Sequence, residues 1–442
     1  MVTVNSTPLS VEGTQGTTVS MAVRWYVLIM MCLVYTLSIA DRYATQQVLD
    51  PIRIEMHLTD FQVSLATGLA LACLYVLLGF PISWLIDRYS RRWIVAVSMI
   101  AWSAMTTLTG LARGPVQFTL ARMGVGIGEA GGTPGANSLL SDYFPIARRP
   151  MALTIFSLGA PIGSWIATTI VGWLYDRFGW RECFMILGVP GVIAGLLVAF
   201  TVREPRRGQL DSNCDEFAPS LLATMKFLWQ QRSAVHIMVG SALTALWGWG
   251  LMAWTPAYLQ RAYHLTPGES GAILGDMNLW GGSLATVITG WLIGRRWFVQ
   301  PGRIVKLLGY FIGLATFASI GIYWTHSLFV AKVMLWIFVP SIYFYIGPCF
   351  GMLNNLAQPR MRALFCASTL FIANVGNLVI APPLIGALSD YFAPPTGSTA
   401  ESLRLAMLCL APSGFWATAH YFLALKRLNG DQERATGVPV SG

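Results

Sequence analysis

Apolar residues run along this chain in long stretches, separated by short polar segments. A helix needs about 20 mostly apolar residues to cross a membrane. Twelve stretches meet this length: residues 25–48, 61–86, 93–112, 116–141, 151–174, 182–201, 234–259, 269–293, 304–324, 327–356, 363–389 and 403–425. The pattern therefore predicts an all-α integral membrane protein with twelve spans.

The distribution of charge agrees with this prediction and orients the chain. Only 11% of the 442 residues are charged, whereas soluble domains average about 25%. Basic residues gather in cytoplasmic loops, and with a cytoplasmic N-terminus 20 of the 29 Lys and Arg lie on that side and seven on the other. We expect a multi-pass protein of the cell inner (plasma) membrane with both termini cytoplasmic. The net charge of +9 then needs no nucleic-acid partner.

One long polar connection divides the spans six and six. We therefore expect an N-terminal six-helix bundle at 21–201, a cytoplasmic linker at 202–233 and a C-terminal six-helix bundle at 234–425. The first 20 residues are rich in Ser, Thr and Gly and should form a disordered cytoplasmic tail. Residues 426–442 should form a second cytoplasmic tail.

The ends of four spans carry related sequences. Span 2 ends SWLIDRYSRR (83–92), and span 5 ends GWLYDRFGWR (172–181). Span 8 ends GWLIGRR (290–296), and span 11 ends more faintly with GALSD (386–390). Spans 2 and 5 cross in opposite directions, whereas spans 2 and 8 cross in the same direction. Inverted repeats nested in two parallel halves resemble the major facilitator fold.

Two further motifs make this resemblance more specific. Residues 83–92 resemble the loop 2–3 motif of the superfamily, with serine in both usual glycine positions. Asp41-Arg42 in span 1, together with ARMGVGIGEA (121–130) in span 4, resembles the spinster-like branch. The same two features also resemble the organic anion:cation symporter branch. The resemblance implies two six-helix bundles with 3+3 inverted repeats around a central cavity that spans 1 and 4 line.

Four charged residues lie inside predicted spans, namely Asp41, Arg42, Arg122 and Glu129. A charge at that depth costs several kcal/mol unless it is paired or hydrated. At about 1.5 Å of rise per residue, Asp41, Arg42 and Arg122 lie at similar depths. Glu129 is seven residues after Arg122, so it lies on the same face of the helix, about 10 Å deeper. These residues are candidates for holding a substrate or a proton, and a purely structural Asp41–Arg122 pair is the alternative.

We assign proton coupling to Asp41 and Glu129, because carboxylates inside a membrane can titrate. The equivalent positions of the second half carry no charge but lie near aromatic residues. A cavity with charge on one wall and aromatic rings on the other suits an anionic head with an apolar tail. The predicted substrate-binding residues are Arg42, Arg122, Glu129, Trp247, Trp254 and Tyr343.

The cytoplasmic end of span 2 is a candidate gate. An acid there could accept hydrogen bonds from the amides at the start of span 11 and stabilise a state closed to the cytoplasm. The predicted gating residues are Asp87, Arg88, Arg91 and Arg92.

These features favour a proton-coupled secondary transporter that works by alternating access. The resemblance implies a lipid-like amphiphile of the sphingolipid or lysophospholipid class, and a proton-coupled organic anion symporter is the alternative. The sequence has no Gly-x-x-x-x-Gly-Lys-Ser/Thr loop, no His-Glu-x-x-His and no Gly-x-Ser-x-Gly, which argues against an ATP-driven pump or an enzyme. A receptor or scaffold is a third possibility. We expect a monomer without a cofactor whose partners are the substrate, protons and membrane lipids.

Overall fold

The computed structural model describes residues 20–145, 148–206, 221–293, 300–358 and 361–436, and in this part of the chain every regular element is a helix, with no strand. Ten of its helices are long and apolar enough to cross a membrane. All twelve predicted stretches are helical, so the predicted all-α fold is confirmed.

The first six spans come from the N-terminal half of the chain. Their elements are α1 (Met21–Gln47), α2 (Leu49–Glu55), α3 (Asp60–Ser64), η1 (Leu65–Leu69), α4 (Ala70–Arg88), α5 (Arg91–Gly110), α6 (Pro115–Glu129), α7 (Gly132–Tyr143), α8 (Arg149–Ser157), α9 (Gly159–Trp165), η3 (Ile166–Ile170), α10 (Val171–Phe178) and α11 (Trp180–Thr201). Span 4 is thus divided into α6 and α7.

The second six spans follow α12 (Leu221–Gln230). Their elements are α13 (Arg232–Tyr263), α14 (Pro267–Asp276), η4 (Met277–Gly282), α15 (Ser283–Ile293), α16 (Pro301–Trp324), α17 (Leu328–Phe344), α18 (Ile346–Asn355), α19 (Arg362–Asn374), η6 (Val375–Ile380), α20 (Ala381–Phe392), α21 (Ala400–Leu410), α22 (Ser413–Ala424), η7 (Leu425–Arg427) and α23 (Leu428–Thr436).

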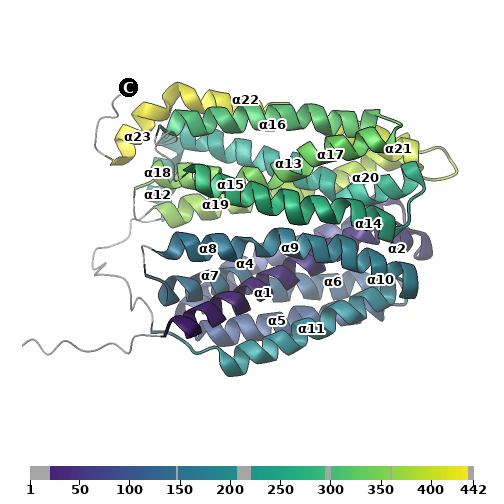
Figure 1. Cartoon of the computed structure of the whole chain (residues 1–442), viewed down its shortest axis with the longest axis horizontal. Helices are drawn as coiled ribbons and strands as arrows, with labels where there is room; N and C mark the ends of the chain where they lie inside the picture. Colours follow the sequence, from purple (N-terminus) through teal and green to yellow (C-terminus); the bar gives the residue numbers. More distant parts are fainter. Residues whose placement is uncertain (1–19, 146–147, 207–220, 294–299, 359–360, 437–442) are drawn as a thin grey trace, which may run out of the picture.

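The two halves lie side by side with their long helices roughly parallel (Figure 1). The purple start of α1 and the yellow α23 lie at the same end of the molecule, which we call the terminal end, and the opposite end is the distal end. Because both described chain ends share one end, the number of membrane crossings between them is even.

The helices extend beyond some predicted boundaries. Residues 221–230, expected to belong to a linker, form α12, and the last span continues as helix to Thr436. The buried side chains of Thr224 and Leu228 on one face of α12 explain why this segment folds against the bundle. Of the predicted N-terminal tail, residues 1–19 lie outside the described residues.

Spans 2, 5, 8 and 11 each contain one π-helical segment, namely η1, η3, η4 and η6. These are the four spans whose ends are related in sequence. The π-helix is rare and is found mostly as single turns at functional sites. The internal repeat therefore has a structural counterpart inside the same four helices.

At the distal end, each half caps a helix of the other half with a carboxylate. Asp390 of α20 accepts hydrogen bonds from the backbone amides of Asp60 and Phe61 at the start of α3, at 3.0 and 2.9 Å. Asp176 of α10 accepts from the Gly268 amide at 3.2 Å and from the Thr266 hydroxyl at 2.9 Å, at the start of α14. We call these two contacts the distal caps.

A buried cluster of charges lies beside the distal caps. The guanidinium of Arg261 in the C-terminal half binds Asp60 at 2.7 Å and Asp50 at 2.5 Å, both in the N-terminal half. Gln47 of α1 also donates to the carbonyl oxygen of Pro267 at 2.6 Å. The distal end is thus closed by direct polar contacts between the halves.

Candidate substrate and proton site

Two of the four intramembrane charges form a buried pair between α1 and α6. Arg122 Nη1 donates to Asp41 Oδ1 at 3.2 Å, and both side chains are almost fully buried. The second carboxylate oxygen of Asp41 accepts from the Thr106 hydroxyl of α5 at 2.6 Å. Three helices therefore hold Asp41 in place.

The other two charges form a second pair. Arg42 contacts Glu129 Oε2 through Nη2 at 2.5 Å and through Nε at 3.2 Å. Glu129 has no exposed side-chain surface, whereas the side chain of Arg42 is 13% exposed. The guanidinium of Arg42 also lies 4.9 Å from the centre of the Tyr75 ring, a distance that favours a cation–π contact.

The helix geometry explains why the pairs form in this way. Adjacent residues of an α-helix point about 100° apart, so Asp41 and Arg42 reach different partners. Arg122 and Glu129 are seven residues apart and share one face of α6. Close packing sets that face, because a Cβ at Gly126 would lie 2.3 Å from the carbonyl oxygen of Leu71 on α4.

Several polar atoms of this site are buried without a hydrogen-bond partner among the described residues. They are Arg122 Nε, Arg122 Nη2, Glu129 Oε1 and, one helical turn beyond Asp41, Thr45 Oγ1. Buried polar atoms are rarely left unpaired. The two pairs thus keep donors and an acceptor available for a further partner.

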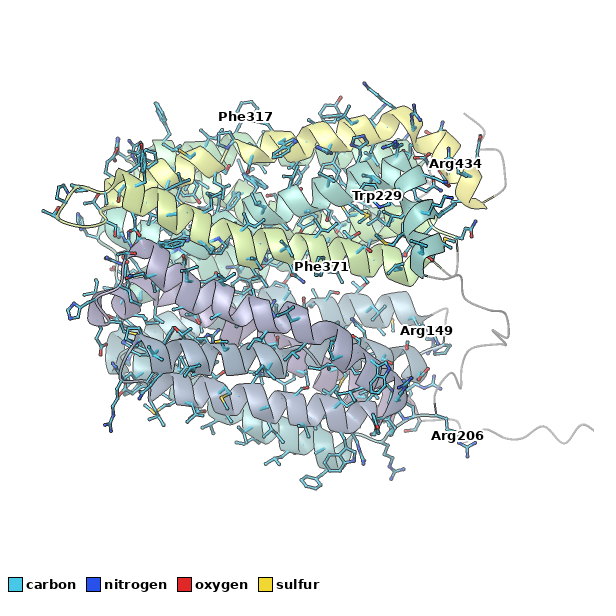
Figure 2. The ribbon with its side chains drawn as sticks, turned by 180° about the vertical axis from the view of Figure 1, so that it is seen from behind. Arg149, Arg206, Trp229, Phe317, Phe371 and Arg434 are labelled. Atoms are coloured by element: carbon cyan, nitrogen blue, oxygen red, sulfur yellow. The ribbon has the colours of Figure 1, made fainter. Side chains whose placement is uncertain are left out.

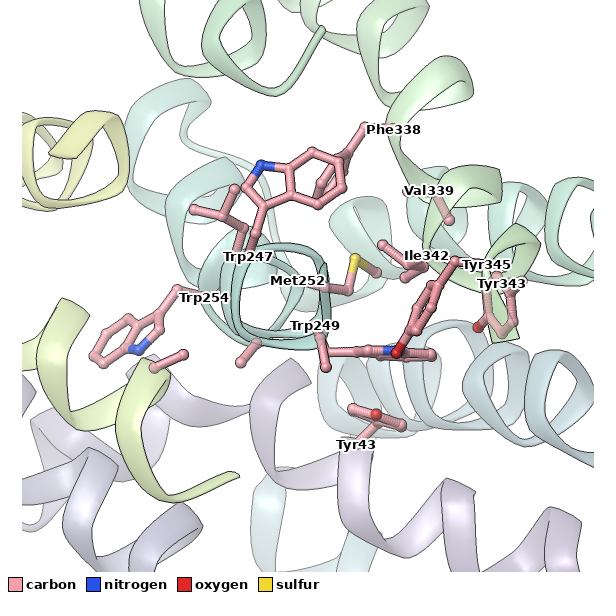
Figure 3. Close-up of a cluster of buried hydrophobic side chains, with 14 of the residues drawn as sticks. Tyr43, Trp247, Trp249, Met252, Trp254, Phe338, Val339, Ile342, Tyr343 and Tyr345 are labelled. Atoms are coloured by element: carbon pink, nitrogen blue, oxygen red, sulfur yellow. The ribbon is translucent and has the colours of Figure 1, made fainter. Parts of the chain in front are cut away.

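The opposite wall of the site is aromatic. The Trp249 ring of α13 stacks on Tyr43 of α1 at 5.3 Å and contacts Tyr343 edge-on at 5.2 Å. The hydroxyl of Tyr343 donates to Asn278 Oδ1 at 2.9 Å, and the Ser164 hydroxyl lies within hydrogen-bond distance of it at 3.0 Å. This wall joins the two halves, since Tyr43 and Ser164 belong to the first and the other three to the second (Figure 3).

The three tryptophans of α13 point in different directions (Figure 3). Trp254 donates to the carbonyl oxygen of Pro382 at 3.1 Å and lines a small cavity of about 30 Å³ with Arg42. Trp247 instead points into the core of the C-terminal half, where it donates to Ser319 at 3.1 Å. Side chains two positions apart on an α-helix point about 200° away from each other. The structure therefore puts Trp249, and not Trp247, beside the charged helix α1.

Among the described side chains of the predicted gating residues, the hydrogen bonds, ion pairs and cation–π contacts of Arg88, Arg91 and Arg92 are all made within the N-terminal half. Arg91 binds Asp142 and, at 2.8 Å, Glu204, and Arg92 donates to the carbonyl oxygen of Val202 at 3.2 Å. Arg88 stacks on Trp84 at 3.9 Å. The side chain of Asp87 lies outside the described residues, as does that of Arg362, its expected neighbour.

Glu204 fastens the start of α5 to the end of α11. Its burial alone would raise the pKa of the carboxyl, but hydrogen bonds from the Arg92 amide, the Arg91 guanidinium and the Ser90 hydroxyl lower this pKa below its usual value. The basic end of span 2 is therefore tied to its own half of the molecule.

Some residues of the site were missed by the sequence reasoning. Thr106 and Asn278 are polar residues in apolar spans, a signal that was available but not specific. The related span ends identify Asp176 and Asp390 as the positions equivalent to Asp87, but they do not indicate a capping role. Their capping of the opposite half requires knowledge of which helices meet.

Comparison with known proteins agrees with this architecture. The family model described as Major Facilitator Superfamily matches residues 31–376. The chain is similar to an MFS-type efflux pump of Mycolicibacterium smegmatis, with 26% identity covering 92% of this chain and 94% of the relative. It is also similar to a probable L-galactonate transporter of Escherichia coli K12, with 26% identity covering 86% and 84%.

Spinster proteins appear among both the sequence and the structural relatives. Protein spinster homolog 1 of Xenopus tropicalis is 24% identical, covering 92% of this chain and 82% of the relative. A solved structure described as a bacterial homolog to the human lysosomal transporter Spinster, inward-facing and occupied, superposes with a TM-score of 0.79 at 28% identity, covering 93% of this chain and 99% of that one. The chain therefore belongs to the spinster-like branch of the major facilitator superfamily and is a transporter, not an enzyme.

Proposed function

We propose that this protein is a proton-coupled transporter of an anionic amphiphile, with the sphingolipid or lysophospholipid class as its substrate. The two crossed carboxylate–arginine pairs opposite a ring of aromatic side chains carry the proposal. Arginine is suited to bidentate recognition of phosphate and carboxylate groups. The aromatic wall would take the apolar part of the substrate.

Coupling follows from the way the pairs share four charges. Protonation of Glu129 would remove the negative partner of Arg42. Of the two arginines, Arg42 is the one whose side chain is partly exposed. Arg42 could then bind the anionic group of the substrate in place of the carboxylate. Protonation of Asp41 would release Arg122 in the same way, and the two events link proton binding to substrate binding.

We propose further that the terminal end faces the cytoplasm and that the protein functions as a monomer in the inner (plasma) membrane. Arg149, Arg206 and Arg434 all lie at the terminal end (Figure 2), in line with the excess of basic residues on cytoplasmic sides. The distal caps would then stabilise the state closed to the outside. Residues 87–92, at the other end of span 2, would form the opposing gate.

A small organic anion is the second candidate substrate. The similarity to the probable L-galactonate transporter favours it, and two arginines would serve a carboxylate as well as a phosphate. In that case the aromatic wall would close over the anion and exclude water. The distinction lies in whether the substrate needs an apolar tail.

Flux into proteoliposomes under an imposed pH gradient tests both candidates. The panel should contain lysophospholipids, sphingoid bases and sugar acids, each with and without the gradient. Gradient-dependent movement of a lysophospholipid or a sphingolipid would support the first candidate, and movement of sugar acids alone would support the second. Uptake that ignores the pH gradient for every compound would contradict proton coupling.

A further inference from the structure

A basic pocket lies at the terminal end of the C-terminal half, apart from the charge pairs. It consists of two adjoining hollows of about 300 and 530 Å³ that share Arg232 and Arg427. Ser233, His236 and Lys426 also line the smaller hollow, and Lys226, Trp229 and Arg434 also line the larger one.

The lining is strongly positive. It contains five Lys and Arg side chains and no Asp or Glu. Arg434 is held by Asp431 at 3.0 Å, but in the described part of the chain the other four cations form no ion pair. Such a group of uncompensated cations attracts an anion.

Ser233 adds a buried hydroxyl to this pocket. The residue has no exposed surface, and its Oγ has no hydrogen-bond partner among the described residues. Ser233 belongs to the first turn of α13, a 32-residue helix whose N-terminus favours negative charge. The Ser233 amide already donates a hydrogen bond to Asp431 at 2.7 Å. The Ser233 hydroxyl, unlike this amide, is available to donate to a bound anion.

The surroundings of the pocket are those of a membrane surface. Leu222 and Trp229 lie seven residues apart on one face of α12 and are 80% and 60% exposed. Trp416 of α22, whose ring lies 6.3 Å from that of His420, is 61% exposed. Exposed tryptophans next to basic residues are typical of the level of the lipid headgroups. In Figure 2, Trp229 and Arg434 are labelled in the same region of the molecule.

We propose that this pocket binds the phosphate group of an anionic phospholipid from the leaflet at the terminal end. Arg232 and Arg427 contact the phosphate oxygens, because they are common to both hollows, and Ser233 Oγ donates one hydrogen bond. Trp229 and Leu222 lie against the glycerol and the first part of the acyl chains. Free inorganic phosphate has the same anionic chemistry but gains nothing from these apolar side chains.

Quenching of tryptophan fluorescence by brominated lipids tests the proposal with the full chain in nanodiscs. Brominated phosphatidylglycerol is added at increasing fractions to phosphatidylcholine, and the same series is run with brominated phosphatidylcholine. The difference between the parent and Trp229→Phe isolates the signal at the pocket. We expect quenching of Trp229 to saturate at a low fraction of phosphatidylglycerol and not of phosphatidylcholine.

Charge variants identify the residues. Arg232→Gln with Arg427→Gln should weaken phosphatidylglycerol binding roughly thirtyfold. The matched control, Arg113→Gln with Arg177→Gln, removes two exposed arginines at the distal end and should leave binding unchanged. Lys426→Gln with Arg427→Gln provides a second test if the first double variant does not fold.

Two results would overturn the proposal. Equal quenching by the two brominated lipids, or unchanged quenching in both charge variants, would mean that the pocket holds no phospholipid. Displacement of phosphatidylglycerol by millimolar inorganic phosphate, with glycerol phosphate equally effective, would assign the pocket to a free anion instead of a lipid.

Discussion

The two halves of this transporter share one repeated fold but differ in what they contribute to the candidate site. The N-terminal half contributes two carboxylates and two arginines from α1 and α6. The C-terminal half contributes Trp249, Tyr343 and Asn278 from α13, α17 and η4. A duplicated scaffold can therefore separate ion chemistry from the recognition of apolar surface, and each half can be altered to test its own task.

The largest effect should come from Glu129→Gln in the charged half. The amide keeps the shape of the side chain but cannot take up or release a proton, and it leaves Arg42 without its counter-charge. Loss of such a buried partner is worth about 3 kcal/mol, or roughly a hundredfold in gradient-driven uptake. Glu401→Gln, an exposed carboxylate at the distal end, is the control. Full dependence of uptake on the pH gradient in Glu129→Gln would move coupling to Asp41.

Arg122 should be next in effect, because its guanidinium binds Asp41 and has two further nitrogens without partners. We expect Arg122→Ala to lower uptake by about tenfold or more and Arg122→Lys to restore only part of it, since lysine lacks the planar fork.

Asp41→Asn should remove the pH response of the distance between the halves, measured with paired spin labels. A parent-like pH response in Asp41→Asn would exclude this pair as the switch.

The aromatic half can be tested with two tryptophans of the same helix. Trp249→Ala should reduce uptake by about tenfold with a modest loss of stability, since it opens the wall against Tyr43. Trp247→Ala should instead lower the free energy of unfolding by about 3–5 kcal/mol, because it leaves a cavity in the core. Measuring uptake and thermal unfolding of both variants shows which side chain serves transport and which serves stability. Equal profiles would show that the two side chains are not divided between site and core.

Each half contributes one of the two distal caps, so the two caps should respond alike to the same change. Asp176→Asn and Asp390→Asn each weaken a charge-assisted hydrogen bond to a helix N-terminus, a contact worth about 1 kcal/mol. We expect each variant to shift the population several-fold towards a state open at the distal end. In the double variant the two free-energy changes should add. Distances between labels on α2 and α21 measure this shift, and Asp276→Asn, an exposed acid of α14, is the control. No shift in either variant would mean that other contacts hold the distal end closed.

The smallest effect should be local to the N-terminal half. The pKa of Glu204 is lowered from 4.5, so its stabilising contribution is complete above the pKa of the unfolded state and is lost as the pH falls below about 4.5. Glu204→Gln should lower the melting temperature at neutral pH by roughly 1–2 °C and flatten its decline in acid. A melting curve with an unchanged pH dependence would remove Glu204 from this role.

The sequence predicted the helical spans and the repeat, because each depends on local periodicity or on counting residues along a helix. It did not predict the partner of Arg42, since the direction of a side chain around α1 depends on packing against α6. It also could not separate Trp247 from Trp249. Residues 247 and 249 are both buried, so no polar face marks which side of α13 meets the other half.

The π-helical segments of spans 2, 5, 8 and 11 have a consequence for insertions and deletions. A π-helical hydrogen bond spans five residues and an α-helical one spans four, so each segment holds about one residue more than a regular helix. Deleting one residue within 65–69 would return span 2 to a regular helix and leave Asp60 and Arg88 on their present faces. The same deletion a few turns away would rotate one end against the other by about 100°. These four segments are therefore the places where the helices can tolerate a change in length.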